Sequence, residues 1–265
     1  MSAIALSIAG SDPSGGAGVQ ADLKTFAALG VYGATVITAL TAQNTLGISA
    51  IEPVSPQFVA AQIDAVCGDL AIGAAKLGML GTAAVVDAVA RGLERHALKN
   101  VVLDPVMVAS SGRELLAPDG VEALRRTLLP QAAIVTPNLP EAAALLEEPA
   151  AQDETQMRAQ AARLLRLGAR AVLIKGGHAV WPESVDFFAD GRVELRLPAP
   201  RIATRNTHGS GCTLAAAIAA GLAKGLALAE AVGEAKAYVS AAIAAADRLA
   251  VGRGAGPLHH FHEWW

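Results

Sequence analysis

The sequence predicts an α/β protein of three layers, α/β/α, with a mostly parallel central sheet. Short apolar runs, too short for typical helices, alternate along the chain with segments in which apolar residues recur at helical spacing. This alternation is typical of βαβ units. The short runs are rich in Val, Ile, Leu and Ala on both faces, as strands covered by helices on each side must be. Because single α/β domains often reach roughly 250 residues, we expect the 265 residues to form one domain, 1–265.

The first strand is expected at residues 3–9, an apolar run that ends in the turn-forming stretch 10–16. A helix follows, because apolar residues recur at helical spacing from Val19 to Ala27. Gly30 then stops the pattern, which marks the end of the helix. The chain therefore opens with a strand, a glycine-rich loop and a helix.

The uncharged stretch 25–51 is long enough to span a bilayer. Glycines, Gln43 and Asn44 interrupt its apolar surface, so we interpret it as a helix end, a strand and a loop. No Lys or Arg precedes Lys24, and the basic region of a secretory signal is therefore missing. We expect a cytoplasmic protein with no membrane partner.

The alternation continues through the middle of the chain. Further parallel strands are expected at residues 31–40, 72–77, 101–103, 133–135 and 171–174, and helices at 56–67, 82–95, 139–146 and 154–167. Residues 184–188 and 192–197 alternate between apolar and polar and are joined at Asp190-Gly191, which predicts an antiparallel hairpin at the sheet edge. From 208 to 249 two Ala-rich helices close the chain, separated by a helix-stop signal at Lys224-Gly225.

The composition excludes several classes of function. Lys and Arg number 21 against 24 Asp and Glu, a net charge of −3, so the chain lacks the basic footprint of a nucleic-acid-binding protein. Aromatic residues make up 4%, too few for a platform that stacks single-stranded bases. Cys67 and Cys212 are the only cysteines and neither belongs to a C-x-x-C pair, so neither a disulfide framework nor a zinc knuckle is expected. The expected partner is a small molecule.

The sharpest motif is Asn206-Thr207-His208-Gly209-Ser210-Gly211-Cys212, which runs directly into an Ala-rich helical stretch. Its glycines let the backbone turn closely, and the free N–H groups of the first helical turn face outward at the positive end of the helix dipole. This arrangement predicts an anion site, with an ordinary glycine-containing N-cap as the simpler alternative. Cys212 would lie in the same turn, where a thiol is favoured as thiolate; the alternative is an inert cysteine on an apolar helix face.

Polar residues at the ends of predicted strands form a second group of candidates, because ligands bind beyond the carboxyl ends of strands in such sheets. They are Asp12, Gln43, Asn44, Asp104, Asn138, Glu141 and Lys175. Any one of them could simply be solvated, but their convergence at one sheet edge predicts a site. The carboxylates of Asp104 and Glu141 suit Mg²⁺, which takes few protein ligands and bridges to phosphate oxygens. Lys175 suits the charge that develops on a transferring phosphoryl group.

Other templates for nucleotide and metal sites do not fit. No Gly-Lys dipeptide occurs, which excludes a Walker A loop, and no intact G-x-G-x-x-G follows a strand. The zinc motif H-E-x-x-H is also absent. The run His259-His260-Phe261-His262 could bind a metal, but Glu263 is its one carboxylate neighbour, and we interpret the run as a solvated tail.

Along its whole length the chain resembles the ribokinase superfamily. Residues 206–212 are similar to the superfamily signature Asp-Thr-x-Gly-Ala-Gly-Asp, with departures at the first, fifth and last positions. The last position holds the catalytic base of that superfamily, and here it is Cys212. A cysteine there is similar to one branch, the hydroxymethylpyrimidine/phosphomethylpyrimidine kinases of thiamin biosynthesis. The same branch is matched, in order, by residues 9–18 and 20–25, Thr41-Ala42-Gln43-Asn44, Lys76-Leu77-Gly78-Met79-Leu80, Asp104-Pro105-Val106-Met107 and Lys175-Gly176-Gly177-His178.

The resemblance implies a ribokinase-like fold and an ATP-dependent kinase. The substrates it implies are 4-amino-5-hydroxymethyl-2-methylpyrimidine and then its monophosphate, which becomes the diphosphate. Gln43 would pair with the aminopyrimidine edge, as an amide reads a donor-acceptor pair on adenine. The Gly10 backbone, Asp22, Met79 and Val106 would help to line the same pocket. The resemblance also implies a homodimer.

For catalysis the resemblance implies the division of labour typical of phosphoryl transfer, in which positioning and electrostatics dominate. Cys212 would be the base, Lys175 would neutralise transition-state charge, and the amides from Gly209 through Ser210 and Gly211 to Cys212 would form the anion hole. The nucleotide phosphates would meet Asn138, Thr207, Gly209 and Gly211, and Mg²⁺ would be held near Asp104 and Glu141. As a base near neutrality Cys212 would need a lowered pKa, which the helix dipole and Lys175 would supply.

Two other functions stay open on the sequence. Pyridoxal kinases of the same superfamily, including a thiol-containing group, bind a similar hydroxymethyl-bearing heterocycle. A non-catalytic pyrimidine-binding regulator with a degenerate base position is the alternative from a different class. The sequence also leaves open whether residues 108–116, around Ser110-Ser111-Gly112, close as a flap, and whether Cys212 is a base or only positions the substrate.

Overall fold

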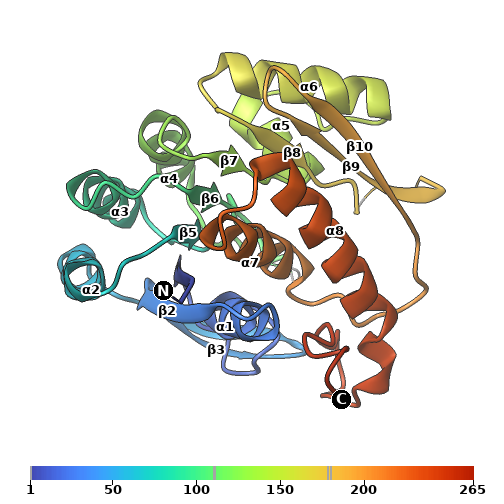
Figure 1. Cartoon of the computed structure of the whole chain (residues 1–265), viewed down its shortest axis with the longest axis horizontal. Coiled ribbons are helices and arrows are strands. Elements are labelled where there is room, and N and C mark those ends of the chain that lie inside the picture. The colour runs from blue at the N-terminus through green and yellow to red at the C-terminus, as the bar shows by residue number, and fades with distance from the viewer. Residues whose placement is uncertain (1, 110–111, 178, 180) are drawn as a thin grey trace.

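The central layer is an eight-stranded sheet in the order β10-β9-β8-β7-β6-β5-β1-β2 (Figure 1). It is seen in a computed structural model that describes residues 2–109, 112–177, 179 and 181–265. From β2 to β8 all neighbouring strands run parallel. These strands are β1 (Ile4–Ala9), β2 (Tyr32–Ile37), β5 (Ala74–Leu77), β6 (Val101–Leu103), β7 (Ile134–Val135) and β8 (Val172–Ile174). The prediction of a mostly parallel sheet is confirmed.

The far edge of the sheet is an antiparallel hairpin, as the sequence predicts. Strand β9 (Glu183–Ala189) pairs antiparallel with both β8 and β10 (Glu194–Pro200). At the turn, Asp190 Oδ1 accepts hydrogen bonds from the N–H groups of Arg192 and Val193, and Gly191 has a φ of 82°. The Asp-Gly pair therefore supplies both the local hydrogen bonds and the left-handed backbone that a tight hairpin needs.

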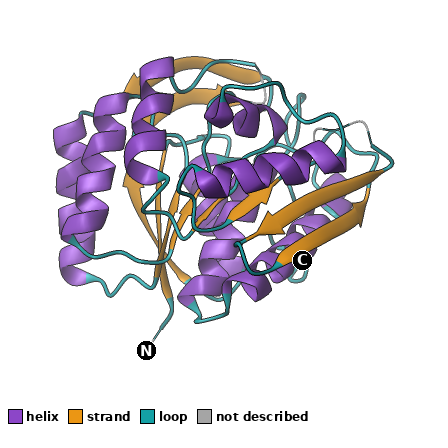
Figure 2. Ribbon diagram, turned by 90° about the horizontal axis from the view of Figure 1, so that it is seen from above, coloured by secondary structure: helices purple, strands orange, loops and turns teal. Residues whose placement is uncertain are grey.

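Helices cover both faces of the sheet, which completes the three layers (Figure 2). One face packs against α1 (Gly18–Ala28), α7 (Ser210–Ala223) and α8 (Leu228–Ala244). The other face packs against α2 (Pro56–Asp69), α3 (Ala83–Arg95), α4 (Pro118–Ala123) with its π-helical extension Leu124–Leu128, α5 (Leu139–Leu146) and α6 (Glu154–Arg166). Within the described residues, no helix has the length and apolar character that crossing a bilayer requires.

The two faces are filled by alternate residues of the same strands. Leu6 and Ile8 of β1 belong to the core beneath α2 to α6, whereas Ala5 belongs to the core beneath α1, α7 and α8. Several alanines of α7 belong to this second core, and small side chains on a sheet-facing helix allow its backbone to lie close to the strands. Figure 1 shows α7 between α1 and α8.

The prediction of one strand at residues 31–40 followed by a loop is wrong in detail. The chain leaves the main sheet at Thr38, whose hydroxyl donates to the Met79 carbonyl over 2.6 Å and whose N–H donates to Ala9 over 3.1 Å. It then forms a separate two-stranded antiparallel sheet from β3 (Ala39–Asn44) and β4 (Gly47–Pro53). Polar residues occupy both strands, so the apolar pattern that predicts a strand does not extend into them.

The histidine-rich end of the chain also differs from the expected solvated tail. His259 and His260 are buried, and His260 Nε2 lies 3.1 Å from Thr213 Oγ1 of α7. Burial lowers the pKa of His260 to about 4, so the imidazole is neutral at pH 7. His259 packs its ring against Trp265, with the ring centroids 4.7 Å apart. His259 and His260 are therefore packed into the interior beside α7, and their burial is a tertiary effect.

The connections place a crevice at the carboxyl ends of β1 and β5. After β1 the chain passes through α1 to β2 on one side, and then returns through α2 to β5 on the other side of β1. The two crossover helices, α1 and α2, lie on opposite faces of the sheet. The loops that lead from the strands to these helices therefore diverge at this point. Such a switch point is where α/β sheets bind ligands.

Candidate active site

A cavity of about 1360 Å³ lies at the carboxyl ends of the parallel strands. It is lined by Gly10, Gln43, Met79, Asp104, Val106, Asn138, Glu141, Lys175, Thr207, Gly209, Ser210, Gly211 and Cys212. The structure thus brings together the residues predicted for the site, with the exception of Asp22 and Asn44. Their individual roles remain predictions.

The first turn of α7 forms one wall of the cavity. Gly209 caps this helix with a φ of 81°, and a Cβ at this position would overlap the Gly16 carbonyl oxygen. Only glycine therefore fits both the backbone conformation and the close approach of the Gly16 loop. Among the described residues, the N–H groups of Gly211 and Cys212 have no acceptor. Free amides at a helix N-terminus can receive phosphate oxygens.

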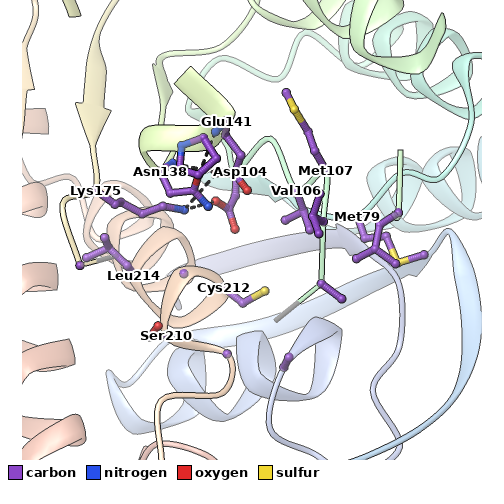
Figure 3. A pocket seen from close by; sticks show the side chains of 18 of the residues that line it. Met79, Asp104, Val106, Met107, Asn138, Glu141, Lys175, Ser210, Cys212 and Leu214 are labelled. Carbon is purple, nitrogen blue, oxygen red and sulfur yellow. Dashed lines mark hydrogen bonds and ion pairs between the residues drawn. The ribbon is translucent and has the colours of Figure 1, made fainter. Parts of the chain in front are cut away.

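Cys212 projects from this turn toward the side of the cavity that holds Val106 and Met79 (Figure 3). The Gly18 N–H, in the first turn of α1, donates toward its sulfur and lowers the thiol pKa. Burial has the larger effect and raises the pKa of Cys212 above the ordinary thiol value. The expectation of a lowered pKa is therefore wrong for the ligand-free protein, because the dry surroundings of the thiol outweigh the favourable dipoles and charges.

Lys175, Asp104 and Glu141 form a charged cluster across the cavity from Cys212 (Figure 3). The Lys175 Nζ lies 2.7 Å from Asp104 Oδ1 and 3.8 Å from Glu141 Oε2. Burial by itself would lower the pKa of Lys175, but the two carboxylates outweigh it and raise that pKa. Lys175 is therefore a permanent cation at the place where strand β8 ends.

Glu141 is held by the start of α5. Its side chain accepts from the Asn138 N–H and its own N–H donates to Asn138 Oδ1, each over 2.8 Å, which makes a capping box. Burial is the main reason that the pKa of Glu141 rises to about 7, with Lys175 opposing it and Asp104 reinforcing it. A further cation bound beside Glu141 would favour the ionised form of its carboxyl.

Asp104 and Glu141 fit the chemistry of Mg²⁺. Both offer hard oxygen ligands, and the ion commonly takes only one or two carboxylates while phosphates and waters fill its other positions. The described residues contain no cluster of three or more His, Cys, Asp or Glu side chains that could enclose a metal. The pair is therefore suited to an ion that arrives with the nucleotide and less suited to a permanently held metal.

Gln43 also lines the cavity, and it lies on β3 and not in a loop after a strand. Its Nε2 is 3.3 Å from His208 Nε2, and its Oε1 accepts from the Thr41 hydroxyl over 3.2 Å. A bulge between Ala42 and Gln43 shifts the pairing with β4 at this point. Bulges re-aim side chains, and here the amide faces the cavity beside an imidazole. Asn44, the neighbouring candidate, does not contribute to the described lining.

Asp12 and His208 are two site residues to which the sequence assigned no role. Asp12 Oδ2 accepts from the Ala17 N–H and lies 2.8 Å from His208 Nε2. Burial would raise the pKa of Asp12, but His208 and Ser14 outweigh it and bring that pKa to about 2. Asp12 therefore ties the glycine-rich loop after β1 to the motif before α7. The signal that could have found His208 is its position inside that motif.

Asp22 is placed differently from its expected position in the pocket lining. Its side chain is fully buried between α1 and the sheet, where it pairs with Lys76, and it is absent from the described lining of the cavity. Sequence reasoning left Lys76 unexplained, although a lysine inside the apolar strand 74–77 is itself an unusual signal.

Described residues of the proposed flap, among them Val108, Gly112 and Glu114, line the cavity. Residues 108 and 114 form an isolated antiparallel bridge, and the Ala109 N–H donates to the Arg113 carbonyl over 2.8 Å. Ser110 and Ser111 lie outside the described residues, as does His178 of the motif that begins at Lys175. Closure of the segment stays a prediction.

Comparison with known proteins supports the same interpretation. The model of the family described as phosphomethylpyrimidine kinase matches residues 12–259. The chain belongs to this family. A hydroxymethylpyrimidine/phosphomethylpyrimidine kinase of Rhizobium meliloti is 61% identical to it over 265 residues, covering 100% of this chain and 99% of the relative. The family predicted from the motifs is confirmed.

Solved structures show that phosphomethylpyrimidine kinases and pyridoxal kinases share this fold. An ADP complex of Bacillus subtilis pyridoxal kinase has a TM-score of 0.91 at 38% identity and covers 98% of each chain. A phosphomethylpyrimidine kinase of Clostridium difficile has a TM-score of 0.81 at 40% identity, covering 91% of this chain and 99% of that one. The predicted ribokinase-like fold is confirmed.

Proposed function

We propose that this protein transfers the γ-phosphoryl group of ATP to the hydroxymethyl group of 4-amino-5-hydroxymethyl-2-methylpyrimidine, and a second one to the resulting monophosphate. The observation that carries the proposal is the single cavity that Cys212, Gln43 and the cluster around Lys175 line together. Family membership supports the substrate. Formation of ADP only when the pyrimidine is present, with the product identified by mass, tests the activity and excludes a non-catalytic regulator.

In the first step Cys212 takes the proton of the hydroxymethyl group. The freed oxygen bonds to the γ-phosphorus, and the bond from that phosphorus to the bridging oxygen breaks, so that ADP leaves with the electron pair. Lys175 and the amides of Gly211 and Cys212 offset the charge on the transferring group. Catalysis of this kind depends mainly on positioning and electrostatics.

Mg²⁺, held by Asp104 and Glu141, would supply charge neutralisation at the nucleotide phosphates. Asn138 orients Glu141 through the capping box, and Thr207 and Gly209 complete the phosphate side of the cavity. Lys175 neutralises both carboxylates in the ligand-free protein and can turn to phosphate when the ion replaces it there. The donor set thus fits a metal that binds together with ATP.

We expect Glu141→Gln to raise the Mg²⁺ concentration needed for half-maximal rate by ~10-fold or more. Loss of a side chain that supports a metal site typically weakens metal binding by at least that factor. Binding of the pyrimidine without metal should stay nearly intact. Initial rates against Mg²⁺ concentration measure the first effect and calorimetry the second. An identical Mg²⁺ dependence in variant and parent would make Glu141 a helix-capping residue only.

We expect Gln43→Ala to raise the KM for the pyrimidine far more than the KM for ATP. The substitution leaves the polar edge of the heterocycle unpaired in a partly buried site, with a loss of about 1–3 kcal/mol. Steady-state kinetics with each substrate varied in turn provide the measurement. Asn44→Ala is a matched control, because that amide does not line the described cavity. A pyrimidine KM equal to that of the parent would remove Gln43 from the site.

Pyridoxal phosphorylation is the second candidate, because pyridoxal kinases of Bacillus subtilis and Staphylococcus aureus both superpose with TM-scores of 0.91. Both alcohols present a hydroxymethyl group on an aromatic nitrogen heterocycle. Comparison of kcat/KM for the pyrimidine and for pyridoxal separates the two functions. We also propose, from family resemblance, that the protein is a cytoplasmic homodimer.

A further inference from the structure

A buried ion pair lies near the first turn of α7, outside the lining of the cavity. Lys76 of β5 and Asp22 of α1 have side chains that are 0% exposed, and Lys76 Nζ donates to Asp22 Oδ2 over 2.9 Å. The Ser7 hydroxyl of β1 donates to the same oxygen over 2.5 Å. Ser7 and Lys76 are direct partners in the register of β1 and β5. The three side chains therefore meet in the layer between the sheet and helices α1 and α7.

This pair is poorly explained as a device for stability. Taking two charges out of water costs free energy that their attraction offsets only in part, and a hydrophobic pair of similar volume is often at least as stable. Many of the other buried side chains of this layer are apolar, and alanine is common among them. Asp22 Oδ1 is buried with no hydrogen-bond partner among the described residues. Lys76 has three N–H donors, and its one described hydrogen bond uses a single donor.

The Lys76 ammonium lies at the carboxyl end of its strand, next to the site. A Cβ added at Gly78 would be 2.8 Å from Lys76 Nζ, and the next residue, Met79, lines the cavity. Helix α7, which carries Cys212, packs directly on β1 and β5. Gly78 thus leaves room for the ammonium beneath the wall that holds the thiol.

Four charged groups from four elements act on the Cys212 thiol or respond to it. Lys76 of β5 lowers the pKa of Cys212, whereas Asp22 of α1 and Asp104 after β6 raise it. Lys175 after β8 is a cation whose own pKa is raised in part by Cys212. Of the charges acting on the thiol, Lys76 has the largest effect, and it opposes the burial that makes Cys212 a weak acid.

We propose that Lys76 is a positioning residue whose buried ammonium, held by Asp22 and Ser7, stabilises the Cys212 thiolate for the first phosphorylation. This inference rests on the proposed role of Cys212 as the base. Lys76 neither gains nor loses a proton in the step; Cys212 takes the substrate proton, and the ammonium acts through its charge. Asp22 keeps Lys76 charged in dry surroundings, which explains why a carboxylate expected in the pocket lies beneath it instead.

Alkylation by iodoacetamide tests the proposal directly, because only the thiolate reacts. In a Cys67→Ser background Cys212 is the single cysteine. Lys76→Met should slow alkylation at pH 8 by about tenfold or more, which corresponds to a rise of one unit in the thiol pKa. Lys99→Met is the matched control, since it removes an exposed charge, and its alkylation rate should equal that of the parent.

The kinetics of the two phosphorylation steps provide a second readout. Lys76→Met should slow the first step by a factor similar to that for alkylation, and the second step much less, because its phosphate nucleophile is already ionised at pH 7. If Lys76→Met does not fold with Asp22 left unpaired, the double variant Lys76→Met with Asp22→Asn removes both charges. It should still slow alkylation, because Lys76 acts on the thiol more strongly than Asp22 does.

An unchanged alkylation rate in a folded variant overturns the role of Lys76. Slower alkylation with an unchanged first step supports the action of Lys76 on the thiol and instead removes Cys212 from the role of base. Failure of the inference and failure of the proposed mechanism are therefore distinguishable.

Discussion

Replacing Cys212 by alanine is expected to slow the first phosphorylation by ~10²–10⁴-fold, the usual contribution of a general base. The second phosphorylation should be spared relative to the first, because its nucleophile is a phosphate oxygen already largely ionised at pH 7. Single-turnover rates on the alcohol and on its monophosphate measure the two effects separately. Equal losses on both steps would reject the base role and leave Cys212 a positioning role.

The pH dependence of the first step follows from the raised pKa of Cys212. At pH 7 most of the thiol is protonated, so the reactive thiolate, and with it the rate, should increase with pH beyond the ordinary thiol value of about 8.5. The second step should show no such rise above pH 7. Cys67→Ala is the control, since Cys67 lies on α2 and does not line the described cavity. A first step that is flat from pH 7 to 9 would contradict deprotonation by this thiol.

Replacing Lys175 by methionine is expected to lower kcat for both phosphorylation steps by ~10²–10³-fold, the loss typical of removing one preorganised electrostatic contact to the transition state. Both steps should suffer alike, because the same γ-phosphoryl group is transferred in each. This pattern differs from that of Cys212→Ala and separates charge neutralisation from proton removal. Single-turnover rates with saturating ATP and Mg²⁺ measure it.

Loss of Lys175 also leaves Asp104 and Glu141 without their cation, so the folded state must be verified by thermal unfolding with and without Mg²⁺. Lys224→Met, an exposed lysine just after α7, is the matched control for the loss of one positive charge. A folded Lys175→Met variant with a rate within a few-fold of the parent would show that the amides of α7 suffice for the transferring group.

The sequence determined the parts of this protein that depend on local pattern. The parallel strands, the Asp190-Gly191 hairpin and the helix that begins at Ser210 follow from apolar periodicity, turn chemistry and glycine placement. The convergence of Asp104, Glu141 and Lys175 also followed, because parallel strands bring their carboxyl ends to one edge. Gln43 lines the same cavity as predicted, but it does so from the hairpin of β3 and β4. The hairpin of β3 and β4 was missed, since its strands carry no continuous apolar pattern.

Tertiary structure alone decided the properties that depend on what surrounds a group. Burial reverses the expected direction of the Cys212 pKa, moves Asp22 from the pocket wall to a pair with Lys76, and turns His260 into a neutral core residue. Periodicity shows which face of an element is apolar, but not which charges from distant segments meet behind it. Because the free energy of an ionised group depends on its distance from other charges and from water, such roles become visible only when the chain is folded.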